Sequence, residues 1–277
     1  DFYVGGALDQ TAALYVQNQK AHFHKMEVTA LQNDRMYEDT GALFFDADGD
    51  GDLDLYVASG GGGETEGLEF LLQDRLYIND GKGGFQRAKE ALPPINSSTQ
   101  ALATADWDGD GDLDLFVGGR TSPGQYPMPP TSYLLINEGG VFSDRTEELA
   151  PALRKPGMIT DAVWTDTDAD GNLDLVVVGE WMPISIFRNT GTKLELTTKN
   201  SGLENTNGWW NSLALADFDG DGDDDIIAGN IGLNNKFHPS VEKPLYVYAN
   251  DFDNSGTLDI VLSKLYRGVQ VPVRGKE

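Results

Sequence analysis

Residues 42–57, ALFFDADGDGDLDLYV, place a nine-residue pattern, Asp-x-Asp-x-Asp-Gly-x-x-Asp, between two apolar segments. The pattern begins again at Asp106, Asp166 and Asp217, and in a weaker form, with Ser at its fifth position, at Asp251. We call these copies loops 1 to 5; they span residues 46–54, 106–114, 166–174, 217–225 and 251–259. Recurrence of one such pattern indicates a repeat protein, and the apolar flanks predict a unit of strand, loop and strand.

A second recurring pattern follows the first in three of the units. Asn79, Asn137 and Asn189 each end a short apolar segment and are followed two residues later by Gly. Asn-x-Gly between strands is typical of a hairpin turn, because both residues tolerate positive φ. The two patterns together predict four antiparallel strands, A to D, with the Asp-rich loop joining A to B and the Asn turn joining C to D.

Four short antiparallel strands in about 50 to 60 residues make one blade of a β-propeller. We therefore predict an all-β fold, a β-propeller of four-stranded blades with about five blades present. The expected divisions of this single domain over 1–277 are a partial blade at 1–40, blades at 41–96, 97–157 and 158–207, and a last segment at 208–277. Residues 1–6 match residues 114–119, which predicts that the chain is part of a larger propeller.

The position of loop 5 has two interpretations. It begins only 34 residues after loop 4. In the first interpretation residues 245–250 are strand C of the preceding blade and loop 5 replaces the turn between C and D. In the second, these residues are strand A of a new blade.

The spacing of the acidic residues predicts metal binding. A tight loop directs the side chains of positions 1, 3 and 5 toward one centre, and Gly at position 6 allows the turn. Position 7 offers a backbone carbonyl and position 9 a carboxylate. A hard cation with six to eight oxygen ligands suits this arrangement. An EF-hand would have Glu at position 12, where strand residues such as Val57 stand instead. Magnesium prefers fewer carboxylates, so we predict four or five Ca²⁺ ions. The predicted ligands are Asp46, Asp48, Asp50, Asp52 and Asp54; Asp106, Asp108, Asp110, Asp112 and Asp114; Asp166, Asp168, Asp170, Asn172 and Asp174; Asp217, Asp219, Asp221, Asp223 and Asp225; and Asp251, Asp253, Ser255, Thr257 and Asp259.

Composition supports a cation-binding protein. The chain has 45 acidic and 20 basic residues, a formal net charge of −25 and no cysteine. A negative surface disfavours nucleic acid as a partner, and disulfides cannot contribute to stability. No apolar segment reaches the roughly 20 residues that a membrane helix requires, so we expect no membrane span in this segment.

The long connections between strands B and C lie, in this arrangement, on the rim opposite the Asp-rich loops. They carry aromatic and charged residues of the kinds that anchor partners: Arg120, Tyr126, Glu180, Trp181, Trp209, Trp210 and Phe237. These residues form a candidate site for a protein or glycan ligand. The alternative is structural, with Trp209 and Trp210 covering the core and Tyr126 packing on prolines.

No set of residues indicates catalysis. His22 and His24 would share one strand face without a third metal ligand, and acyl-transfer patterns are lacking. Glu64, Glu66, Glu69 or Glu180 could face a cleft, so paired carboxylates for glycoside chemistry stay open. The sequence favours a non-enzymatic protein and leaves an enzyme open.

The Asp-rich loops resemble those of the FG-GAP/VCBS repeat families of integrin-α-type propellers. Residues 118–120, 126–127, 179–183 and 208–211 look like bacterial VCBS proteins that carry an ASPIC/UnbV domain. The resemblance implies calcium loops on one rim, seven blades in many relatives, and an extracellular or cell-surface location, including the bacterial outer surface or periplasm.

Three functions are compatible with these features. The first is a calcium-binding extracellular module for protein or glycan interaction or adhesion. The second is a glycan-binding or polysaccharide-processing component, such as a lyase or hydrolase, on the same scaffold. The third is a structural spacer in a larger surface protein.

Overall fold

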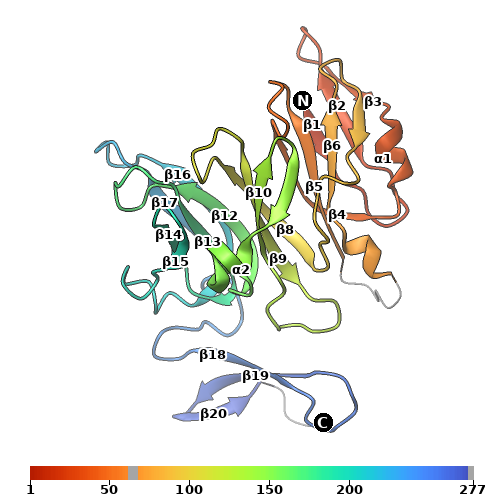
Figure 1. Cartoon of the computed structure of the whole chain (residues 1–277). Coiled ribbons are helices and arrows are strands. Elements are labelled where there is room, and N and C mark those ends of the chain that lie inside the picture. Colours follow the sequence, from red (N-terminus) through yellow and green to blue (C-terminus); the bar gives the residue numbers. More distant parts are fainter. Residues whose placement is uncertain (62–67, 274–277) are drawn as a thin grey trace.

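The computed structural model describes residues 1–61 and 68–273, and it confirms the predicted all-β fold. Within these residues there are twenty strands, and the helices are short: α1 (Thr29–Asn33), α2 (Thr146–Leu149) and the 3-10 turns η1 (Glu69–Leu72) and η2 (Pro151–Leu153). Figure 1 shows the sheets side by side along the chain, with β18 to β20 set apart from the others. No helix in the described part of the chain combines the length and the apolar character needed to cross a membrane.

Two sheets have the complete predicted blade. One has the order β4-β5-β6-β7 and the next β11-β10-β9-β8, which is the same A to D order along the chain. Their strands are β4 (Glu38–Phe45), β5 (Asp54–Gly60), β6 (Arg75–Asn79) and β7 (Phe85–Arg87), and β8 (Ser98–Ala105), β9 (Asp114–Thr121), β10 (Tyr133–Glu138) and β11 (Val141–Asp144).

The third sheet repeats this order and is joined to strands of the next unit. Strand β12 pairs with β13, β13 with β14, and β14 with β15. The end of β13 also pairs with β16, which in turn pairs with β17. The bounds are β12 (Met158–Thr165), β13 (Asp174–Met182), β14 (Ser185–Asn189), β15 (Leu194–Leu196), β16 (Gly208–Ala216) and β17 (Asp225–Asn230).

Two three-stranded sheets lie at the ends of the described chain. The first contains β1 (Phe2–Val4), β2 (Ala13–Gln17) and β3 (Phe23–Met26), and the last contains β18 (Leu245–Asn250), β19 (Asp259–Tyr266) and β20 (Val269–Pro272). Because β18 pairs with β19 and not with β17, loop 5 joins an A strand to a B strand. The structure thus agrees with the second interpretation of this loop, and the first is wrong.

The five units share one register. The last residue of each A strand pairs with the ninth loop residue: Phe45 with Asp54, Ala105 with Asp114, Thr165 with Asp174, Ala216 with Asp225, and Asn250 with Asp259. The B strands β5 and β13 are almost wholly buried, as their near-continuous apolar composition predicts. Loops 1 to 3 therefore lead into buried B strands, whereas the strands that flank loops 4 and 5 are mostly half-buried or exposed.

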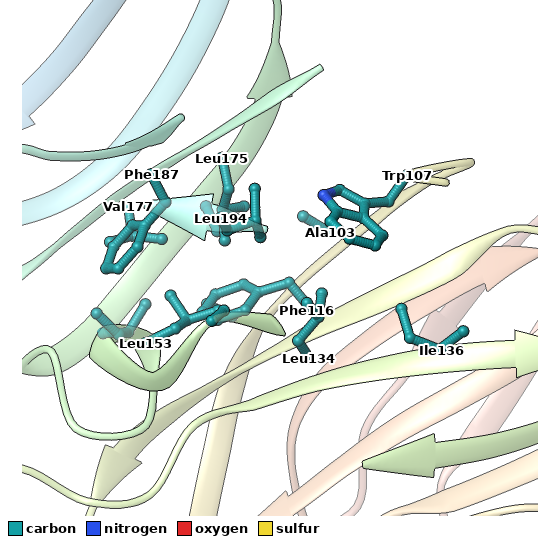
Figure 2. Close-up of a cluster of buried hydrophobic side chains, with 14 of the residues drawn as sticks. Ala103, Trp107, Phe116, Leu134, Ile136, Leu153, Leu175, Val177, Phe187 and Leu194 are labelled. Atoms are coloured by element: carbon teal, nitrogen blue, oxygen red, sulfur yellow. The ribbon is translucent and has the colours of Figure 1, made fainter. Parts of the chain in front are cut away.

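Apolar layers between neighbouring sheets form the core. Figure 2 shows one of them, in which Phe116 and Leu134 pack with Val177 and Phe187 of the following sheet. A second layer, around Tyr56 and Leu135, lies between the preceding pair of sheets. Face-to-face packing of successive four-stranded sheets is the arrangement of propeller blades.

The innermost strands of neighbouring sheets touch through their backbones. A Cβ at Gly41 would lie 2.2 Å from the Gln100 carbonyl oxygen, so only glycine permits this approach of β4 to β8. Thr40, at a β-bulge in β4, donates its hydroxyl to the Thr99 carbonyl at 2.5 Å. At the equivalent bulge in β12, Thr160 donates to the Trp210 carbonyl at 3.0 Å. Hydrogen bonds thus connect neighbouring sheets next to the apolar layers.

Candidate metal centres and a candidate binding face

The first Asp of each loop closes the turn. Asp46 accepts hydrogen bonds from the N–H groups of Gly49 at 2.9 Å and Gly51 at 3.0 Å. In loops 2 to 5 the first carboxylate also accepts from the backbone N–H of position 6. Position 6 is glycine in every loop, with φ between 86° and 99°. The pattern therefore folds as a compact turn around its first carboxylate.

Position 4 also has positive φ in all five loops, a feature that the predicted ligand pattern does not include. Glycine occupies it in loops 1, 2 and 4, whereas Ala169 in loop 3 has φ 57° and Asn254 in loop 5 has φ 59°. Asn tolerates this region, but Ala does not favour it. Recurrence of Gly at position 4 in three loops was the signal available in the sequence.

In loops 1 to 3 the ninth Asp connects its loop to strand C. Asp114 is fully buried; its Oδ2 accepts from the Trp107 N–H at 3.1 Å and its Oδ1 from the Asn137 N–H at 2.8 Å. Asp54 and Asp174 accept from the second loop residue and from the Asn of the C to D turn in the same way. The ninth carboxylate is therefore a structural acceptor as well as a candidate ligand.

The first residue of the chain has the geometry of a ninth position. Asp1 Oδ1 accepts from the Gln17 N–H at 2.7 Å, and Phe2 pairs with Tyr15 as Leu55 pairs with Tyr77. The sequence match between residues 1–6 and 114–119 thus reflects equivalent positions in the fold.

The Asn of the C to D turn also reaches the preceding sheet. Asn137 donates its side-chain amide to the Ala47 carbonyl in loop 1 at 2.9 Å, and Asn189 donates to the Trp107 carbonyl in loop 2 at 3.4 Å. Both carbonyls belong to the second position of the preceding loop. Each of these two loops is therefore held by its own sheet and by the next one.

Each loop brings three carboxylates together. One oxygen from each lies within 4.8 Å of the other two, and the groups are Asp46, Asp48 and Asp50; Asp106, Asp108 and Asp114; Asp166, Asp168 and Asp174; Asp217, Asp219 and Asp225; and Asp251, Asp253 and Asp259. Two oxygens bound to one Ca²⁺ at 2.3–2.6 Å are at most about 5 Å apart, so these groups fit one ion each. Among the described residues the fifth position joins such a group only in loop 1.

Burial and neighbouring charges shift the pKa values of several loop carboxylates. Burial, assisted by the charges of Asp108 and Asp110, raises the pKa of Asp114 to about 6. A hydrogen bond with Asp221 and its charge raise the pKa of Asp223. In loop 1 the Asp52 Oδ1 is buried and has no hydrogen-bond partner. A bound cation would relieve the repulsion between the carboxylates.

Five of the seven residues of the candidate binding face lie together. Glu180 is buried; Arg120 forms an ion pair with its Oε1, and the Tyr126 hydroxyl donates to its Oε2 at 3.2 Å. The Trp181 indole donates to the Tyr126 hydroxyl at 2.8 Å, and its ring centroid is 5.5 Å from that of Trp209. We call these five residues the Trp181 face.

Two predicted members of that face point elsewhere. Trp210 follows Trp209 in β16 and so projects from the opposite side of the strand, where its indole donates to the Thr206 carbonyl at 3.0 Å. Phe237 lines a cavity of about 400 Å³ with Ile260 and Leu262 of β19. The sequence could not separate Trp209 from Trp210, because either residue of the pair could have faced the rim.

The candidates for catalysis that the structure describes lie on different elements. Glu180 is already bound by Arg120 and Tyr126, Glu69 begins η1, and His24 lies on the exposed strand β3. Glu64 and Glu66 lie outside the described residues. Of the four glutamates, the described Glu69 and Glu180 therefore lie on separate elements, η1 and β13.

The sheets and their loops define a repeat protein with propeller-type blades and Asp-rich turns between the first two strands. A family model described as FG-GAP-like repeat matches residues 46–117 and 166–228. FG-GAP-like repeats are therefore detected in these two segments, as the sequence indicated, and the segments begin at loops 1 and 3. No curated protein matches the chain.

Proposed function

We propose that the chain is a calcium-binding module in which ions in the Asp-rich loops stabilise a blade scaffold that presents the Trp181 face to a partner. The observation that carries the proposal is the recurrence, in five loops, of three carboxylate oxygens within 4.8 Å of one another. Recurrence at equivalent positions is not expected of solvated acidic turns, and the FG-GAP-like repeats agree with it. The finer likeness to bacterial proteins with an ASPIC/UnbV domain stays a prediction.

The number of bound ions tests the metal part of the proposal. Equilibrium dialysis of the chelated chain against millimolar calcium should give four or five ions per chain, with magnesium a poor substitute. Asp106→Asn and Asp217→Asn should each remove about one ion, because each takes a first-position carboxylate from one loop. Glu90→Gln, which changes an exposed carboxylate outside the loops, is the matched control and should keep the full number. A chain without bound calcium would refute the proposal.

The Trp181 face supports the second part of the proposal. A Trp pair beside a guanidinium on a rigid scaffold provides apolar area and hydrogen-bond donors, which are favoured in binding sites. The buried Glu180 holds both Arg120 and Tyr126, so the face is organised before a partner arrives. We infer an extracellular or cell-surface site of action, which the resemblance to FG-GAP/VCBS repeats supports.

A glycan array and a screen of surface proteins test this face. We expect Trp209→Ala to weaken a ligand found with the native chain by at least about tenfold, as removal of an aromatic anchor does. Tyr248→Ala, an exposed aromatic residue of β18, is the control and should leave binding unchanged. New reducing ends from a bound glycan would favour the polysaccharide-processing alternative, and failure of every screen would favour a spacer.

A further inference from the structure

Loop 3 differs from the other loops because a basic side chain already occupies it. Arg188 Nη2 forms an ion pair with Asp168 Oδ2, at the third position, and lies 3.3 Å from Asp170 Oδ2, at the fifth. In the described part of the chain, no other Asp-rich loop has a Lys or Arg within ion-pair distance of its carboxylates. The guanidinium thus binds two carboxylates that a calcium ion would use.

The register of strand C shows that Arg188 replaces an apolar residue. Phe187 pairs with Leu175, as Tyr77 pairs with Leu55 and Leu135 with Leu115. One residue further along, Arg188 therefore corresponds to Ile78 and Ile136. Both isoleucines pack in the apolar layers between sheets, so an aliphatic side chain fits this strand position elsewhere in the same chain.

The side chain has room to leave the loop. Arg188 is about half exposed, at 48%. A cavity of about 340 Å³ next to the loop is lined by Arg188 together with Thr197, Asn200 and Ser201. The guanidinium could therefore exchange its carboxylate partners for solvent and hydroxyl groups at modest cost, since exposed ion pairs contribute little.

We propose that Arg188 competes with calcium for the carboxylates of loop 3. Its guanidinium neutralises Asp168 and Asp170 in the absence of calcium and must move away when calcium binds. Loop 3 then fills at a higher calcium concentration than loops 1 and 2, although all three carry four side-chain carboxylates at positions 1, 3, 5 and 9. The inference rests on the proposed function, because it presupposes that the loops bind calcium.

Hydrogen exchange measured by mass spectrometry on the full chain can follow each loop separately during a calcium titration. We expect protection of residues 166–174 to have a higher midpoint than protection of 46–54 and 106–114. Arg188→Ile, which installs the residue of the equivalent positions, should lower the loop 3 midpoint by about tenfold, because a positive charge beside the ion is removed. The midpoints of the other loops should move much less.

Arg188→Gln provides a second variant that keeps a polar side chain and should shift the same midpoint in the same direction. Protection in all loops with an unchanged loop 3 midpoint in both variants would overturn the role of Arg188 alone. Absence of calcium-dependent protection in every loop would overturn the proposed function itself.

Discussion

Saturating calcium should raise the melting temperature of the chelated chain by about 20 °C or more. An ion present at about 100 times its dissociation constant adds about 2.7 kcal/mol to the free energy of unfolding, so four loops add about 11 kcal/mol. For a chain of this size 1 kcal/mol moves the melting temperature by about 2–4 °C. The loops hold 23 of the 45 acidic residues, whose repulsion is unrelieved in the chelated chain. Calorimetry with and without calcium measures the shift.

Sodium chloride at equal ionic strength is the control, since screening alone should give only a small rise in melting temperature.

The pH dependence of the chelated chain provides a second check. In the chelated chain the raised pKa of Asp114, about 6, means that the folded state binds a proton more tightly than the unfolded one. Its contribution to the free energy of unfolding therefore grows as pH falls from about 6 toward about 4, and Asp114→Asn removes it. Equal melting temperatures in chelator and in calcium would contradict the predicted stabilisation by calcium.

Asp114→Ala should destabilise the chain by about 2–6 kcal/mol even in chelator. The substitution leaves the N–H groups of Trp107 and Asn137 without acceptors, and each unsatisfied buried group costs about 1–3 kcal/mol. Loss of the loop 2 ion should add to this cost in calcium. Urea unfolding of the variant and the native chain, in chelator and in calcium, separates the two contributions.

Asp106→Ala is the matched comparison for the same loop. Its carboxylate accepts from Gly109 and Gly111, which are exposed, so that water can satisfy their N–H groups. This variant should lose stability in calcium and little in chelator, where one repelling charge has been removed. If both variants behaved alike in chelator, the structural role assigned to the ninth carboxylate would be wrong.

Much of the fold could be predicted from local chemistry. Gly51 and its equivalents require positive φ, and the apolar runs beside them, such as residues 42–45, must form strands; these signals gave the blade unit. The place of loop 5 could not be decided in this way, because both interpretations pair β18 with β19 and they differ only in whether β17 pairs with β18. Periodicity alone makes 245–250 equally suitable as an A or a C strand.

The site was predicted less completely than the fold. Spacing identified the carboxylates of positions 1, 3 and 9 that meet in four loops, but not the two backbone hydrogen bonds accepted by Asp114. Nor did it indicate that Arg188 reaches loop 3, since a long side chain can cross between elements without leaving a periodic signal. Long-range partners of this kind require the three-dimensional arrangement.

The amide hydrogen bond from Asn137 to the Ala47 carbonyl attaches loop 1 to two sheets, its own and the one that follows. In an array of nearest-neighbour units, such a shared contact couples the unfolding of adjacent units. Release of one ion would then loosen its own sheet and the one that follows it. Calcium loss in this region should therefore be cooperative, with a steeper dependence on free calcium than independent sites would give.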